Sequence, residues 1–207
     1  MHIPNHRTES GIEKPSPAGG NLWSYLFLIG SCRLVLNTAR RFAYPFAPAI
    51  SRGLNVPLNA VTAVIALNQL AGLAVLLLGP IGDRIGYRAM MLGGLGLMGA
   101  GMLIGAIFPV YGGVLTALAL AGLGKGIFDP AIQADIGDKI PYERRALVVG
   151  LIEMSWAGST LVGIPLIGLL IETLGWRSAF WLLGVLGVAG ALALAMVPAS
   201  TPGRRPP

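Results

Sequence analysis

Charged and polar side chains recur inside long apolar stretches of this chain. In the first stretch, Arg33, Asn37, Arg40 and Tyr44 follow one another at spacings of four, three and four residues. Residues at these spacings share one face of a helix. Because a charge at the centre of a bilayer costs about 2.5–3.5 kcal/mol on insertion scales, such a face should avoid lipid. The pattern therefore predicts a polar interior or a watery cavity.

The arginines of this stretch suggest the kind of ligand that such a cavity would hold. The guanidinium fork of Arg40 suits a carboxylate or a phosphate, which favours an anionic or zwitterionic solute. Arg41 lies about 100° around the helix from Arg40, so its direction stays open. Arg33 is interpreted as a side chain that snorkels toward the membrane surface rather than as a ligand.

Two later apolar stretches carry acidic groups as well. Lys125 and Asp129 are four residues apart, a spacing that permits an ion pair along a helix, and Gln133 continues their face. Glu153 is followed one turn later by Trp156, which is interpreted as a packing residue. Asp129 or Glu153 could carry a coupling proton; alternatively, the charges neutralise one another and fix helix packing. If the three stretches approach one another, one polar site would contain Arg40, Arg41, Lys125, Asp129 and Glu153.

Composition places these charges in a membrane protein. Hydrophobic residues make up 54% of the chain and charged residues 12%, with a mean hydropathy of +0.71. A soluble domain normally has about a quarter of its residues charged, so the chain is expected to be embedded in a lipid bilayer. The single cysteine, Cys32, lies in the first apolar stretch and is interpreted as a small buried side chain.

The elements that must position these residues are membrane-spanning helices, each of about 20 mostly apolar residues. The expected fold is all-α, with a disordered cytoplasmic tail at 1–21, a six-helix transmembrane bundle at 22–197 and a cytoplasmic C-terminal tail at 198–207. Pro45 and Pro48 predict a break near the outer end of the first helix. The predicted spans are 22–50, 58–79, 90–109, 112–134, 147–170 and 178–197.

The distribution of basic residues predicts the orientation of the bundle. Lysine and arginine concentrate on the cytoplasmic side of membrane proteins. With the N-terminus inside, the outer segments hold only Arg52 and Arg177. Both termini are therefore expected in the cytoplasm, and the positive charge is assigned to topology, which argues against nucleic-acid binding. The inner segments hold Arg7, Lys14, Arg84, Arg88, Lys139, Arg144, Arg145, Arg204 and Arg205.

A charged, glycine-rich turn separates the second and third predicted spans. Its pattern, G-x-x-x-D-R-x-G-x-R, consists of Gly79, Asp83, Arg84, Gly86 and Arg88. The turn closely resembles the loop between the second and third helices of the major facilitator superfamily, whose members are secondary transporters. The resemblance implies a conformational latch, in which the aspartate caps a helix N-terminus and the arginines pair with acidic groups. The alternative is a turn that only sets the topology.

Other segments resemble the same family in the expected order. The glycine-rich segment at 122–131 is similar to the fourth helix, and the segment at 175–181 is similar to the entry into the sixth. The fifth span contains residues similar to a helix-packing motif that is common in the family's antiporters, namely Gly158, Gly163, Pro165 and Gly168. Two departures stand out. Leu118 occupies the place of a frequent arginine in the fourth helix, and Ile164 that of a frequent proline in the fifth; the displaced proline means that the fifth-helix motif does not support antiport.

The resemblance implies a secondary active transporter of a small solute, working by alternating access in the cell (inner) membrane. The basic side chains of the predicted site, Arg40, Arg41 and Lys125, favour an anionic or zwitterionic solute. Because the family normally has two six-helix bundles, the resemblance implies that this bundle is the N-terminal half of the usual twelve helices. One bundle cannot alternate access alone, so transport would require a second half. The second six-helix half would come from another copy of this chain or from a separate chain; alternatively, the chain is a truncated, inactive product. The competing interpretation is a membrane scaffold or regulatory partner that does not transport.

The apolar stretches lack the residues that metal binding and serine-triad catalysis require. The only histidines, His2 and His6, lie in the N-terminal tail, so no His/Cys metal site and no serine triad is expected. The segment at 122–125 lies within an apolar stretch, where a nucleotide could not reach it. We therefore expect no enzyme, no metal and no cofactor beyond a coupling proton or ion.

Overall fold

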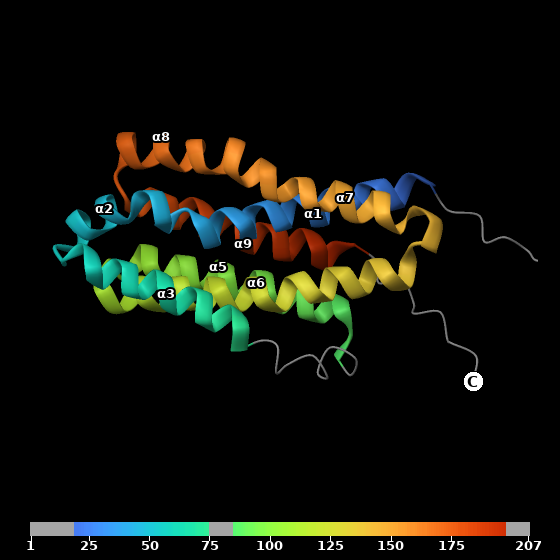
Figure 1. Cartoon of the computed structure of the whole chain (residues 1–207), viewed down its shortest axis with the longest axis horizontal. Coiled ribbons are helices and arrows are strands. Elements are labelled where there is room, and N and C mark those ends of the chain that lie inside the picture. Colours follow the sequence, from blue (N-terminus) through green and yellow to red (C-terminus); the bar gives the residue numbers. More distant parts are fainter. Residues whose placement is uncertain (1–18, 75–84, 198–207) are drawn as a thin grey trace, which may run out of the picture.

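The computed structural model describes residues 19–74 and 85–197, and within these ranges the chain is helical, without strands. The helices pass back and forth along one axis, so that α1 begins and α9 ends at the same end of the bundle (Figure 1). In chain order the elements are α1 (Gly19–Arg41), α2 (Ala43–Leu54), α3 (Leu58–Ala74), α5 (Tyr87–Ile107), α6 (Tyr111–Lys139), α7 (Tyr142–Gly158), the π-helix η2 (Ser159–Gly163), α8 (Ile164–Leu174) and α9 (Arg177–Met196).

The prediction of an all-α membrane bundle is confirmed. Each of the six predicted spans contains a helix, and within the described residues five helical runs are long and apolar enough to cross a membrane. The second predicted span contributes a shorter apolar helix, Leu58–Gln69. The five long runs are Leu22–Arg41, Tyr87–Ile107, Tyr111–Lys139, Tyr142–Leu174 and Arg177–Met196.

The first predicted span is divided in two at Phe42, between α1 and α2. Proline has no N–H, and its ring clashes with the carbonyl four residues earlier. Pro45 therefore disturbs the helix at Arg41, at the point where the break occurs. Pro48, by contrast, lies inside α2 without ending it.

The predicted end of the fourth span at residue 134 is wrong, because α6 continues to Lys139. Asp135 and Lys139, placed by sequence in the following loop, form an ion pair at 2.8 Å along the helix. Arg145 then donates to the carbonyls of Gly137 and Ile140, which the end of the helix leaves without intrahelical partners. These contacts stabilise the extra turn.

The fifth pass runs from Tyr142 to Leu174 and contains a π-helix at Ser159–Gly163. The N–H of Ile164 bonds to the carbonyl of Ser159, five residues earlier, as a π-turn requires. Pro165 follows at once and offers no N–H of its own. The wider turn keeps the helix continuous next to a proline.

Glycines bring the backbones of α5, α6 and α9 close together. A Cβ added at Gly124 would overlap the backbone carbonyl of Gly94, and one added at Gly187 would lie 2.9 Å from the Cα of Gly99. Small residues at such crossings let membrane helices pack closely. The apolar core lies along these contacts and includes Met98, which is fully buried.

Candidate functional site

Arg33 joins three helices at the centre of a polar cluster. From α1, its Nε donates to Asp129 Oδ1 on α6 at 3.2 Å, and its Nη1 lies 2.7 Å from Glu153 Oε1 on α7. The same Nη1 donates to the carbonyl of Ile152 at 3.3 Å. Arg33 is 7% exposed, so its charge is held by these partners rather than by water.

Lys125 completes the cluster from one turn earlier on α6. Its Nζ lies 2.5 Å from Asp129 Oδ2, so the two oxygens of this carboxylate contact different cations. We call Arg33, Lys125, Asp129 and Glu153 the ionic network; it contains two cations and two carboxylates. The side chain of Glu153 is 48% exposed and that of Asp129 is 30% exposed, so the network reaches the surface of the bundle on its acidic side.

The network corrects two sequence interpretations. The snorkelling role assigned to Arg33 is wrong, because the side chain is buried and paired with two carboxylates. Arg40 and Arg41 were expected beside these carboxylates, but neither contacts them. The spacing of Arg33, Asn37 and Arg40 correctly places them on one helix face. It does not indicate which of these residues lies opposite the carboxylates of α6 and α7.

Asn37 lies one turn beyond Arg33 and connects α1 to α7. Its Nδ2 donates to Ser155 Oγ at 3.3 Å, and the side chain is almost wholly buried. Its Oδ1 has no hydrogen-bond partner within the described residues. A buried acceptor of this kind has lost its hydration without a replacement.

Arg40 is directed toward α3. Its Nε donates to Gln69 Oε1 at 2.9 Å, its Nη2 contacts the same oxygen, and the Gln69 amide donates to the Tyr44 hydroxyl. Asn68 Nδ2 donates to the carbonyl of Arg40 at 3.4 Å. Arg40 thus has neutral partners and links α1 to the second pass.

Arg41 is directed the other way, toward α7 and η2. Its Nη1 donates to Thr160 Oγ1 at 2.7 Å, and its guanidinium carbon lies 4.5 Å from the ring centroid of Trp156. The Thr160 hydroxyl donates in turn to the carbonyl of Trp156 at 3.2 Å. Trp156 is 55% exposed, so it is a cation–π partner at the surface rather than only a packing residue.

A second polar cluster lies nearer the beginning of α1 and was not predicted. The Tyr25 hydroxyl donates to Asp135 Oδ2 at 2.8 Å, and Lys139 donates to that hydroxyl at 3.3 Å. The Lys139 ammonium also lies 4.3 Å from the centroid of the Tyr25 ring. The spacing of Asp135 and Lys139 was the available signal, but both had been assigned to a loop.

Part of the predicted latch lies outside the described residues, namely Gly79, Asp83 and Arg84. Gly86 has a φ of 89°, a conformation that favours glycine, and precedes α5. Arg88 Nη2 donates to the carbonyls of Leu194 and Ala195 at the end of α9, at 3.1 and 2.9 Å. The described partners of Arg88 are therefore backbone carbonyls of this bundle rather than acidic groups.

The glycines of the predicted packing motif face the first pass. A Cβ added at Gly158 would lie 3.0 Å from Leu34, and one added at Gly168 would lie 3.1 Å from Phe46. A Cβ at Gly163 would overlap Thr38. Pro165 is at the start of α8. The fifth pass thus presents a row of small residues to α1 and α2.

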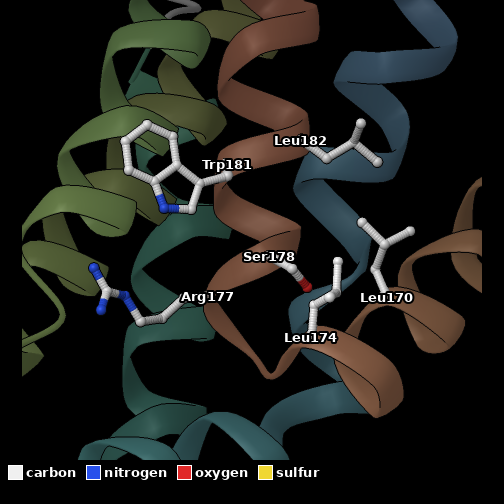
Figure 2. A pocket seen from close by; sticks show the side chains of 6 residues that line it. All are labelled: Leu170, Leu174, Arg177, Ser178, Trp181 and Leu182. Atoms are coloured by element: carbon white, nitrogen blue, oxygen red, sulfur yellow. The ribbon is translucent and has the colours of Figure 1, made fainter.

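A separate open groove crosses the outside of α8 and α9. Figure 2 shows Leu170 and Leu174 on one side of α9 and Arg177 and Trp181 directed toward the other. Arg177 already donates to the carbonyl of Ala106 through Nη2 at 2.8 Å. The groove shares no residue with the ionic network, so the candidate site remains the α1–α6–α7 face.

Comparison with known proteins identifies the family. A model of the Major Facilitator Superfamily matches residues 29–207. The Uncharacterized MFS-type transporter YwfA of Bacillus subtilis is 29% identical over 158 residues, which cover 76% of this chain and 37% of that protein. The Vesicular acetylcholine transporter of Rattus norvegicus is 33% identical over 186 residues, covering 88% and 34%.

A shorter match is to Sialin of Ovis aries, 34% identical over 115 residues, covering 50% of this chain and 23% of that protein. The chain spans about a third of the length of the first two relatives. Together with its apolar helices, these matches make it a multi-pass membrane protein. The chain belongs to the Major Facilitator Superfamily.

Proposed function

We propose that this bundle is one half of a secondary active transporter that moves a small anionic solute across the cell (inner) membrane by alternating access. The observation that carries the proposal is the ionic network, in which charges from α1, α6 and α7 meet inside membrane-spanning helices. Such charges are costly in lipid and mark solute or proton pathways. Membership of a family of transporters supports the same conclusion.

Within this proposal, the carboxylates of the network have the coupling role. Asp129 and Glu153 share Arg33 and are partly exposed, so water can deliver a proton to either. Protonation of one carboxylate would weaken its attraction to Arg33 and release part of the contact between helices. The network would thereby connect the charge state of the pathway to the packing of α1 against α6 and α7.

Alternating access requires a second six-helix bundle, which rocks against this one around the pathway. We propose that it comes from a second half, whether a second copy or another polypeptide segment. The positive-inside distribution of lysine and arginine supports an orientation in which α1 begins and α9 ends on the cytoplasmic side.

The test is solute uptake by membrane vesicles that contain the chain and its second half, after a thermal-stability screen of organic anions, sugars and drugs has selected the solute. We expect saturable uptake that falls at least tenfold in Asp129→Asn. Glu172→Gln, which changes an exposed carboxylate at the far end of α8, is the matched control and should transport normally. Uptake that survives Asp129→Asn would refute the coupling role.

The competing function, a scaffold or regulator, makes a different prediction in the same assay. No solute would accumulate with any pairing, while the chain would still form a stable complex with a membrane partner. That result would refute transport by this bundle.

A further inference from the structure

We propose that Arg41, held by Trp156 and Thr160, is the anion-binding subsite of the pathway, and that it takes an organic carboxylate with an apolar body. This inference rests on the proposed function, because it assigns the solute class to the same pathway. The anion would bind at Arg41, eight residues after Arg33 on α1, and thus outside the ionic network.

The balance of charge around Arg41 favours an anionic ligand. Within residues 19–74 and 85–197, the two cations of the ionic network are matched by two carboxylates. Arg41 contacts only a hydroxyl and an aromatic ring there, and Arg40 contacts only an amide. A guanidinium inside a membrane span without a carboxylate partner is expensive, so it favours the arrival of an anion.

The contacts of Arg41 leave part of its guanidinium open to a carboxylate. Thr160 occupies one donor of Nη1, and the Trp156 ring lies against the guanidinium. The remaining N–H groups have no partner within the described residues, and a guanidinium offers them in a fork that matches a carboxylate. Because Thr160 itself donates to the carbonyl of Trp156, its oxygen is oriented to accept from Arg41.

The π-helix η2 lies next to Arg41. Thr160 is the second residue of η2, and the wide turn is anchored by the bond from Ile164 N–H to Ser159 O. Single π-turns inside α-helices are frequent at functional sites. Here the turn bears the hydroxyl that holds Arg41, so the local departure from α-geometry lies in contact with the proposed subsite.

The depth of Trp156 and Thr160 in the membrane favours a dissolved solute over a lipid headgroup as the source of the anion. With a rise of 1.5 Å per residue, Trp156 and Thr160 lie about 21 and 27 Å along a fifth pass of about 50 Å. They are therefore near its middle, away from the phosphate groups of lipids. The exposed ring of Trp156 offers an apolar surface, which favours a carboxylate attached to an apolar body over a bare inorganic anion.

The experiment is calorimetric titration of the full chain in phosphatidylcholine nanodiscs with benzoate, acetate, inorganic phosphate and the neutral isostere benzamide. We expect saturable binding of benzoate, weaker binding of acetate and phosphate, and none of benzamide. Arg41→Gln should weaken benzoate binding at least tenfold, and Arg41→Lys should weaken it less, because a lysine keeps the charge without the fork. Arg52→Gln, on α2, is the control and should bind normally.

Thr160 is tested as a positioning residue by two substitutions. Thr160→Val removes the hydroxyl at nearly constant shape and should weaken benzoate binding several-fold, whereas Thr160→Ser should restore it. Equal binding of benzoate by the wild type, Arg41→Gln and Arg41→Lys would overturn the proposal. So would equal binding of benzoate and benzamide, preferential binding of phosphate, or no binding of benzoate.

The two proposals fail separately. If benzoate binding depends on Arg41 while no solute is transported with any second half, the anion subsite stands and the transport function falls. If Asp129→Asn abolishes uptake while the Arg41 variants bind benzoate normally, transport stands and the subsite falls.

Discussion

The α5–α9 side and the α1–α7 side of the bundle are held together by different means. Along α5 and α9, glycines let the backbones approach, and Gly99 and Gly187 lie in direct contact range. At the two ends, Arg88 donates to the last carbonyls of α9, and Arg177 donates to a carbonyl at the end of α5. Each of these antiparallel helices thus caps the other.

The α1–α7 side instead depends on charges. Arg33, Asp129 and Glu153 meet there, with part of the acidic surface exposed. Backbone-to-backbone packing has one close arrangement, whereas an ion pair can be broken by a proton or replaced by a ligand. We therefore call the α5–α9 side the fixed side, and under the proposed function we expect the α1–α7 side to be the part that moves.

The largest effect is expected from filling a glycine contact on the fixed side. Gly99→Leu would force a side chain against the backbone of Gly187 and Val188 on α9, so we expect a loss of more than about 3 kcal/mol or no folded protein. Gly93→Leu is the matched control, because nothing lies within 4 Å of a Cβ there. Thermal unfolding in detergent measures both, and equal stability of the two variants would contradict the packing account.

Breaking the ionic network should cost nearly as much. Arg33→Ala leaves Asp129 and Glu153 without their shared partner. We expect a loss of about 3 kcal/mol, the lower end of the range for buried pairs, because both carboxylates are partly exposed. The same unfolding assay gives the value. A cost below about 0.5 kcal/mol would mean that solvent already screens these charges.

Replacing the whole network separates its contribution to stability from its contribution to uptake. Apolar residues of similar volume can replace a buried ionic cluster at little cost or with a gain. We therefore expect near-normal unfolding temperature but no uptake from a variant that combines Arg33→Met, Lys125→Met, Asp129→Leu and Glu153→Leu. Retained uptake would show that these charges only pack the helices.

The smallest effect is expected at the helix caps. Arg177→Ala removes a charged donor from the carbonyl of Ala106, and we expect a loss of about 1–2 kcal/mol without a change in solute affinity. Arg52→Ala, which changes an arginine in the last turn of α2, serves as the comparison. An unfolding temperature equal to that of this control would indicate that the cap contributes nothing.

Sequence patterns were sufficient for the fold and for part of the site. Apolar length predicted the passes, and the four-residue spacing of Lys125 and Asp129 predicted their ion pair. The role of Arg33 was missed, because a pattern along one helix does not reveal its level against another. The extension of α6 was missed because the charges of Asp135 and Lys139 indicated a loop. In the structure, these charges pair with each other and contact Tyr25, so the helix continues.

We propose that the ionic network borders a water-filled pathway. The most direct test is labelling of Gln133→Cys and Glu153→Cys by a membrane-impermeant maleimide, after Cys32 is changed to alanine. Maleimides require a hydrated thiolate, so we predict rapid labelling at both positions and none at Leu169→Cys, an exposed leucine on α8. Labelling of Leu169→Cys alone, or of none of the three, would contradict the account.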